Sequence, residues 1–197
     1  MHSPNNLPIG RIEHFCLTWK AKILLFIGQR ERATDVFKTM LVRVPNDVHA
    51  LNSLGYAWLQ SGHPAQAMPY FAQVVQLTPQ LSNAHFNHAF TCEALGMLVE
   101  AERGFRAAIA IEDKMDRAWY GLGLTLVRLG RMDEAVAALK RNTNLQPMSP
   151  FGWYQLARVH VELKQPEQAL SVIRHLKGFE PKVAAQLERE TGLKVRI

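Results

Sequence analysis

The sequence has few cysteines and no long apolar segment. Only two of its 197 residues are cysteine, Cys16 and Cys92, which is too few for a disulfide framework, so we expect a reducing compartment such as the cytoplasm. The apolar run Ile23–Ile27 is far shorter than the roughly 20 residues of a membrane-spanning helix. Because the run is this short and is interrupted on its N-terminal side by Lys20 and Lys22, we expect neither a signal peptide nor a membrane span.

Motifs of the common catalytic classes are also missing. The sequence has no phosphate-binding glycine–lysine loop, nucleophile elbow, zinc-protease helix motif or dinucleotide fingerprint. Gly121 and Gly123 lie inside a predicted helix, where a glycine permits close packing, so they do not form a phosphate loop. We therefore predict that the protein is not an enzyme and needs no cofactor.

What the sequence does contain is a helical hairpin pattern with a period of 34 residues. The segment Val48–Pro79 shows it best: Leu51 and Leu54 mark one helix, Gly62 ends it, and Phe71 marks a second helix. A fixed period of this length is typical of a helical solenoid. The pattern starts at five positions: His14, Val48, Ser82, Asp116 and Pro150.

Small residues recur at one position in each helix of the hairpin, where two antiparallel helices can approach closely. In the first helices they are Ala21, Gly55, Ala89, Gly123 and Ala157. In the second helices they are Ala33, Ala67, Ala101, Ala135 and Ala169. Four residues later stand Phe37, Phe71, Phe105, Leu139 and Ile173. The turn holds Gly28, Gly62, Gly96, Gly130 and then Lys164, a position that favours glycine because helices commonly end in a left-handed conformation.

These columns resemble the tetratricopeptide repeat (TPR) family, and the resemblance covers His14 to about Lys182. It implies an all-α fold: a right-handed superhelical α-solenoid of five helix-turn-helix hairpins in one elongated domain, with a C-terminal capping helix. The expected parts are an irregular arm at 1–13, a TPR domain at 14–182 with repeats 14–47, 48–81, 82–115, 116–149 and 150–182, and a cap and tail at 183–197. Asp113 replaces the usual closing proline, so we expect a looser or more helical link into the fourth repeat.

The first helix of the first repeat is apolar on every side, from Phe15 to Ile27, and such a helix needs cover on every side. No earlier repeat supplies it. The arm at 1–13, a second copy of the chain, or a bound partner could cover it. A large exposed apolar patch usually marks an interface, so self-association through the first repeat is one of the expected outcomes.

The resemblance also implies where a partner binds, because the first helices of TPR hairpins line a concave groove. The matching positions combine aromatic anchors with amides and a few cations. They are Trp19, Lys22, Asn52, Tyr56, Asn83, Phe86, Asn87, Phe90, Arg117, Tyr120, Tyr154 and Arg158. We therefore expect an adaptor or scaffold that binds a peptide or helix of another protein. A chaperone for a secretion or export substrate, or an assembly factor, is the alternative.

One variant of the family clamps a C-terminal carboxylate, and the sequence matches it only in part. Asn87 and Arg117 fit that pattern. Asn52, Tyr56 and Gly121 stand where the clamp has a cation, an amide and an arginine. The mismatches do not favour this variant.

Basic residues predominate in the C-terminal part, where 114–197 holds fourteen Lys and Arg against eight Asp and Glu. They could steer an acidic partner or simply keep a helical face solvated. The positions considered for steering are Arg117, Arg128, Arg131, Lys140, Arg141 and Arg158. Because the basic residues are scattered rather than striped, an RNA-binding helical repeat is only a second alternative.

Only one group of residues has metal-like spacing, namely His85, His88 and Cys92, which share one helix face. In the repeat register these positions face the core between helices, and His160 takes the place of Cys92 in the fifth repeat. We therefore predict core packing and no metal site.

Overall fold

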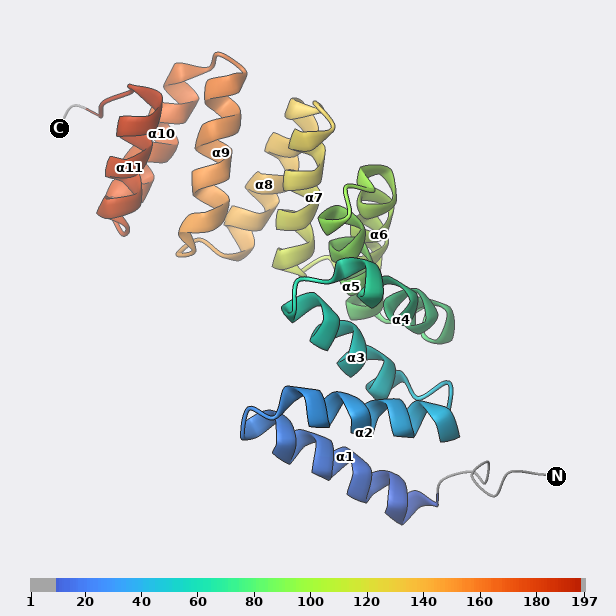
Figure 1. Cartoon of the computed structure of the whole chain (residues 1–197). Coiled ribbons are helices and arrows are strands. Elements are labelled where there is room, and N and C mark those ends of the chain that lie inside the picture. Colours follow the sequence, from blue (N-terminus) through green and yellow to red (C-terminus); the bar gives the residue numbers. More distant parts are fainter. Residues whose placement is uncertain (1–9, 196–197) are drawn as a thin grey trace. The chain divides into compact units, whose positions relative to one another are not determined.

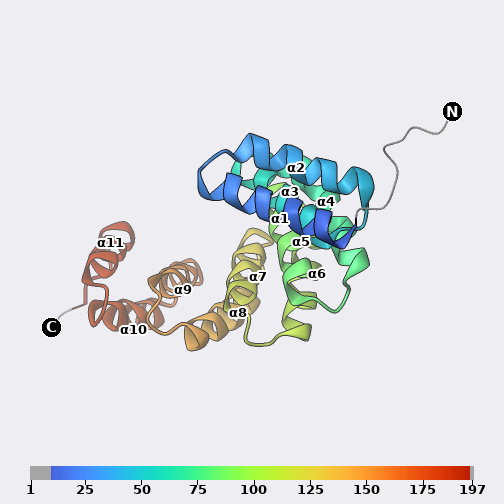
Figure 2. The ribbon, with the colours of Figure 1, turned by 90° about the horizontal axis from the view of Figure 1, so that it is seen from below.

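The computed structural model describes residues 10–195, and within them the chain forms eleven α-helices and no strand (Figures 1 and 2). The helices are α1 (Arg11–Phe26), α2 (Arg30–Arg43), α3 (Val48–Gln60), α4 (Pro64–Leu77), α5 (Ser82–Ala94), α6 (Leu98–Ile111), α7 (Asp116–Arg128), α8 (Met132–Leu145), α9 (Pro150–Glu162), α10 (Pro166–Lys177) and α11 (Pro181–Thr191). None of these described helices has the length and hydrophobicity to cross a bilayer.

The chain divides into two compact units. The N-terminal unit extends to Gly96 and contains α1–α5, and the C-terminal unit begins at Met97 and contains α6–α11. Each has its own core: Phe37, Met40 and Leu54 lie in a buried cluster of the first, and Leu139 and Ile173 in a buried cluster of the second. The all-α prediction is confirmed.

The periodic columns occupy the positions that close packing requires. All five alanines of the second-helix column are fully buried, and the bulky column four residues later is at most 2% exposed. A Cβ added to Gly55 would lie 2.6 Å from Phe71 Cζ, and one added to Gly123 would lie 2.8 Å from Leu139 Cδ2. These first-helix positions must therefore be small because the bulky column of the same hairpin fills the space beside them, as the sequence predicts.

The turns adopt the predicted left-handed backbone. Gly28, Gly62, Gly96 and Gly130 all have φ between 74° and 78°, and Lys164 at the fifth turn has φ 56°. Lys164 is the one non-glycine residue with positive φ among the described residues. The hairpin geometry therefore imposes this conformation even where the sequence does not supply glycine.

We expect Lys164→Gly to raise the free energy of unfolding by up to about 1 kcal/mol, because a left-handed backbone strains a residue that carries a Cβ. The reverse change in the preceding hairpin, Gly130→Lys, should lower it by a similar amount. Urea unfolding followed by helical circular dichroism measures both. Destabilisation by Lys164→Gly would contradict this account of the turn.

The link between α6 and α7 corrects one expectation. It has four residues, Glu112–Met115, as do the links that precede α3, α5 and α9. The Met115 N–H donates to Glu112 O at 3.1 Å, as the Asp47 N–H does to Val44 O in the first link. The prediction of a more helical link was wrong, because a hydrogen-bonded turn forms here without the closing proline.

Helix α1 packs through one side only. Ala21 and Leu24 join the buried cluster formed with α2, while Ile12, Phe26 and Ile27 are exposed. The helix begins at Arg11, inside the expected arm, and residues 1–9 of that arm lie outside the described residues.

The C-terminal helix α11 covers the last hairpin. Ala184 and Leu187 are fully buried against α9 and α10, and α11 ends at Gly192, which has φ 72°. Glu188 pairs with Lys177 Nζ at 2.8 Å and accepts a hydrogen bond from the Val195 N–H. The predicted capping helix is present, with its polar residues turned away from the core.

Candidate functional site

The predicted groove residues on α3 and α5 are called here the α3–α5 face. It consists of Asn52, Tyr56, Asn83, Phe86, Asn87 and Phe90. The Tyr56 hydroxyl donates to Asn87 Oδ1 at 2.8 Å, and Asn87 Nδ2 donates to Asn52 Oδ1 at 3.4 Å. Asn52 Nδ2 in turn donates to Val48 O. These bonds join the two helices through side chains and hold the Tyr56 ring in place.

Two aromatic rings of this face are presented to solvent. Tyr56 is 42% exposed and Phe90 is 46% exposed. The edge of Tyr56 contacts the buried Phe71 ring at a centroid distance of 5.4 Å, and Phe90 stacks on Phe86 at 6.2 Å. Each exposed ring therefore packs against a second, less exposed ring, so the face is partly apolar.

Asn87 is buried, whereas the groove pattern implies an amide that is accessible to a partner. It is only 4% exposed, and its amide already makes two hydrogen bonds inside the protein. It orients Tyr56 rather than offering a free amide. Asn83 is exposed.

On α1, Trp19 and Lys22 lie together. The Lys22 Nζ lies 5.4 Å from the centre of the Trp19 ring, and Phe15 contacts the same ring edge-on at 6.1 Å. A cation over an indole face is a favourable arrangement. Both predicted residues are exposed, so they are accessible to a partner.

A cavity of about 840 Å³ opens beside Tyr56 in the N-terminal unit. The first helices contribute Leu25, Ser53 and Tyr56 to its lining. Its other wall is charged and comes from α2: Arg30, Glu31, Asp35 and Lys38. The groove pattern missed this wall because it considers first helices only; the one signal was the run of charged residues that opens α2.

The predicted residues of the C-terminal unit lie on α7 and α9 and are called here the α7–α9 face: Arg117, Tyr120, Tyr154 and Arg158. The Arg158 guanidinium lies 5.9 Å from the centre of the Tyr154 ring. The Tyr154 hydroxyl donates to Glu190 Oε2 of α11 at 2.6 Å. This bond raises the pKa of Tyr154 and lowers the pKa of Glu190. Tyr120 is half-buried against the core, whereas Arg117 is exposed.

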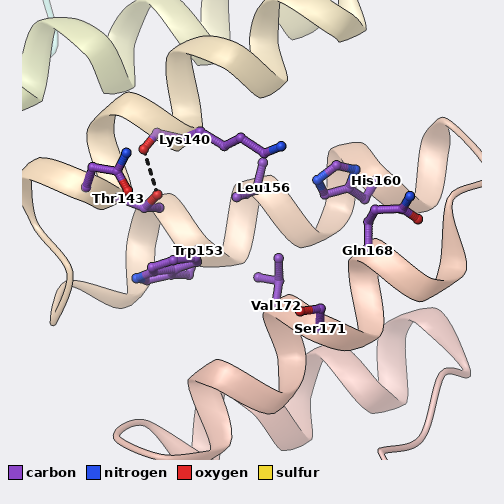
Figure 3. Close-up of a pocket in the computed structure, with 9 residues that line it drawn as sticks. Lys140, Thr143, Trp153, Leu156, His160, Gln168, Ser171 and Val172 are labelled. Atoms are coloured by element: carbon purple, nitrogen blue, oxygen red, sulfur yellow. Dashed lines mark hydrogen bonds between the residues drawn. The ribbon is translucent and has the colours of Figure 1, made fainter.

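A second cavity, of about 350 Å³, lies in the C-terminal unit between α8, α9 and α10 (Figure 3). Leu156 and Val172 form its apolar part, with Trp153 at one end and His160 at the other. His160 is buried, and its Nδ1 lies 2.7 Å from Gln165 Oε1. No predicted groove residue lines this cavity.

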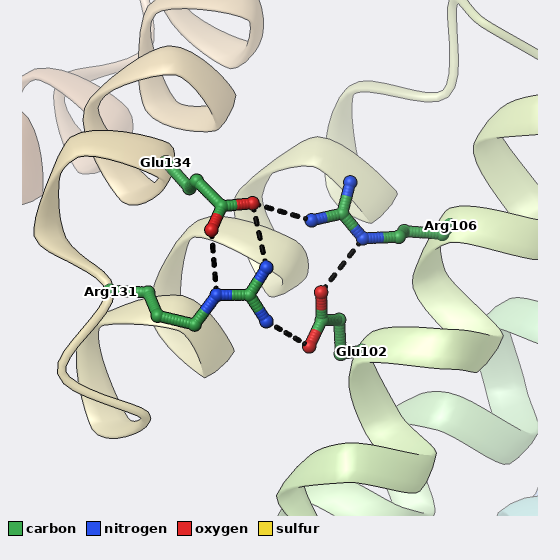
Figure 4. Close-up of polar contacts among 4 residues, drawn as sticks. All are labelled: Glu102, Arg106, Arg131 and Glu134. Carbon is green, nitrogen blue, oxygen red and sulfur yellow. Dashed lines mark hydrogen bonds and ion pairs between the residues drawn. The ribbon is translucent and has the colours of Figure 1, made fainter.

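Two of the arginines considered for steering an acidic partner are already paired. Arg131, the residue before α8, contacts Glu102 and Glu134, which also hold Arg106, so that two side chains of α6, one of α8 and Arg131 form a closed network (Figure 4). The hydrogen bond between Arg131 and Glu134 raises the pKa of Arg131 and lowers that of Glu134. Arg141 pairs with Asp113 at 3.2 Å. These exposed charges are balanced within the protein rather than offered to a partner.

The histidines and cysteine with metal-like spacing do not converge. Cys92 is fully buried, as predicted, with its Sγ 3.8 Å from His88 Nδ1. His85 instead donates its Nε2–H to Pro79 O at 2.8 Å and is only half-buried. Within residues 10–195, no three His, Cys, Asp or Glu side chains are placed to hold a metal ion.

Two family models match the chain. One is described as a tetratricopeptide repeat and matches residues 20–82. The other is described as subunit 3 of the anaphase-promoting complex, or cyclosome, and matches residues 105–176. Comparison with curated proteins gives no significant match.

Several solved structures share the fold. A MamA crystal structure superposes with a TM-score of 0.79 at 18% identity, covering 93% of this chain and 97% of MamA. A MamA structure from Desulfovibrio magneticus RS-1 gives 0.76 at 20% identity and covers 89% and 94%. YrrB, described as a TPR protein with an unusual peptide-binding site, gives 0.75 at 16% identity and covers 86% and 88%. Identities this low show a shared fold alone.

Proposed function

Since the chain is a tetratricopeptide repeat protein, we propose that it is an adaptor or scaffold that binds a peptide or helical segment of another protein. Proteins of this family are generally non-catalytic, and the proposal includes no reaction. A second copy of the chain, the other partner that the sequence suggests, would use the first repeat and leave the α3–α5 face free.

The α3–α5 face carries the proposal. Exposed aromatic rings are the side chains most often found at the centres of interfaces. Tyr56 and Phe90 are held in place before any partner arrives, by the hydrogen bond to Asn87 and by the stack on Phe86. Binding to such a face costs less ordering entropy than binding to mobile side chains. YrrB, which shares the fold, is described as having a peptide-binding site.

The chemistry of the two faces indicates the partner. The α3–α5 face has no Lys, Arg, Asp or Glu among its six residues, so it suits an apolar or aromatic anchor and backbone amides. The α7–α9 face carries Arg117 and Arg158 and suits an acidic or aromatic side chain. A segment that becomes ordered on binding should bind with micromolar affinity, which corresponds to a binding free energy of about 8 kcal/mol in magnitude.

Two alternatives belong to the same proposal. A chaperone for a secretion substrate, or an assembly factor, would use the same faces and differ only in the partner. An RNA-binding role would show itself by a steep loss of affinity with salt. We place the protein in the cytoplasm, because Cys16 and Cys92 are both free thiols.

The experiment is to identify a partner by affinity capture and then titrate it against Tyr56→Ala, Phe90→Ala and Tyr120→Ala. We expect Tyr56→Ala and Phe90→Ala each to weaken binding about tenfold or more, since truncating an aromatic anchor costs roughly 1–2 kcal/mol. Val42→Ala, an exposed residue on α2, is the control and should bind normally. Unchanged binding by all three aromatic variants would refute the proposal.

A further inference from the structure

The outer side of α1 carries an exposed apolar surface as long as the helix itself. We call it the α1 stripe and define it as Ile12, Phe15, Trp19, Ile23, Phe26 and Ile27. At 100° per residue these side chains fall within about 120° of the helix circumference. Their exposed fractions range from 51% to 92%. Ala21 and Leu24, which are buried against α2, lie on the opposite side.

Comparison with α3, one repeat later, shows which positions of α1 lack the packing that a preceding hairpin would provide. One period later, Ala50 and Leu54 of α3 are fully buried in the cluster that α2 helps to form. Their counterparts in α1, Cys16 and Lys20, are exposed. Cys16 and Lys20, which adjoin the stripe, therefore lie where a preceding hairpin would pack. The aromatic residues of the stripe correspond instead to His49, Ser53 and Gln60 of α3, none of which is buried. No described segment of the chain covers the stripe.

The exposed apolar area of the stripe is large enough for a protein interface. Its three aromatic rings alone expose roughly 400 Å². The largest apolar patch on a typical monomer is about 300–600 Å² in total, and larger ones usually mark an interface. When the exposed area of the three isoleucines is added, the total exposed area of the stripe approaches the roughly 800 Å² that each partner buries in a stable interface.

We propose that the α1 stripe is a homodimer interface, in which the α1 helices of two copies pack against each other. A two-fold pair buries the same patch on both copies, so one contact covers both stripes. Each copy also supplies an apolar helical face of the length that the other needs. Residues 1–9 are a poorer match, because they contain Pro4 and Pro8 and few large apolar residues, whereas the stripe needs a continuous apolar partner.

The other end of the chain does not offer a complementary surface. Helix α11 turns Lys182, Gln186, Arg189 and Glu190 outward, and all four are exposed. Its apolar residues Ala184 and Leu187 are fully buried. Head-to-tail stacking of α11 on the stripe would therefore bury charges against aromatic rings, which is unfavourable. A closed pair is the arrangement that the surfaces favour.

Sedimentation velocity of the full chain over a range of concentrations tests the proposal. We expect a monomer–dimer equilibrium that Phe26→Glu shifts at least tenfold towards monomer. Phe151→Glu, which changes another highly exposed phenylalanine on α9, should leave the equilibrium unchanged. Because Phe26 is 92% exposed, the variant should fold normally, and helical circular dichroism checks this.

Thiol labelling gives a second readout. Cys16 is exposed and adjoins the stripe, whereas Cys92 is buried. Labelling of Cys16 should slow as protein concentration rises in the wild type but not in Phe26→Glu.

A chain that is monomeric at every concentration, or a dimer that Phe26→Glu and Phe151→Glu leave equally intact, would overturn the proposal. A monomer whose Cys16 is protected even at high dilution would also overturn it, and would indicate that another part of the chain covers the stripe. Neither result would bear on peptide binding by the α3–α5 face.

Discussion

Replacing Phe71 with alanine is expected to lower the free energy of unfolding by about 3–5 kcal/mol. The Phe71 ring is fully buried. It fills the space beside Gly55, where its Cζ lies 2.6 Å from the position of an added Cβ, and it supports the edge of Tyr56. Alanine would leave a cavity between α3 and α4 that neither backbone can close, because the turn at Gly62 fixes the hairpin.

Urea unfolding followed by circular dichroism measures this loss. The matched control is Phe151→Ala, which removes the same side chain from a position that is 69% exposed and should change stability by less than about 0.5 kcal/mol. Equal effects of the two variants would contradict the assignment of Phe71 to the core. Phe71→Leu, which keeps most of the buried volume, should recover much of the loss.

The second large effect is expected at Gly152, where the sequence and the structure predict opposite signs. Three other repeats have alanine at this position: Ala50, Ala84 and Ala118. Alanine is also favoured over glycine inside a helix by about 1 kcal/mol. From the sequence, Gly152→Ala should therefore stabilise the protein.

The structure reverses this expectation. A Cβ added to Gly152 would overlap Asn142 Oδ1 and lie 3.1 Å from Thr143 Cγ2. Asn142 is buried, and its Nδ2 donates to Asp116 O at 2.9 Å, so it can move aside only by losing a buried hydrogen bond. We expect Gly152→Ala to destabilise the protein by about 1–3 kcal/mol.

A double-mutant cycle with Asn142→Ala isolates the cause. Asn142→Ala removes the obstructing amide, so Gly152→Ala should cost little or even stabilise in that background. Thermal and urea unfolding of the four proteins give the coupling energy. If the two changes were additive, or if Gly152→Ala were stabilising on its own, the overlap with Asn142 would not control this position.

The candidate site was only partly predictable. The 34-residue register placed Tyr56 and Phe90 on first helices, and both rings are exposed. It could not show that Asn87 is engaged by Tyr56 and Asn52, since hydrogen bonds between repeats depend on how neighbouring helices are spaced. The same limit hid the charged wall of the cavity beside Tyr56, which α2 provides.

The charge available to a partner was also only partly predictable from the sequence. The excess of Lys and Arg in the C-terminal part is visible in the sequence. The pairing of Arg131 with Glu102 and Glu134 joins residues up to 29 positions apart, and it arises because the N-terminal end of α8, with Arg131 before it, lies beside α6. Composition alone therefore overstates the positive charge that is available to a partner.

The sequence by itself determined the helices, their order, the positions of the turns and the columns that pack, because each depends on local periodicity and on residue size within one hairpin. Tertiary structure alone decided which side of α1 stays exposed, which amides are already bonded, and that Gly152 leaves no room for a methyl group. Those properties depend on side chains of neighbouring helices, and the sequence does not record the distances between them.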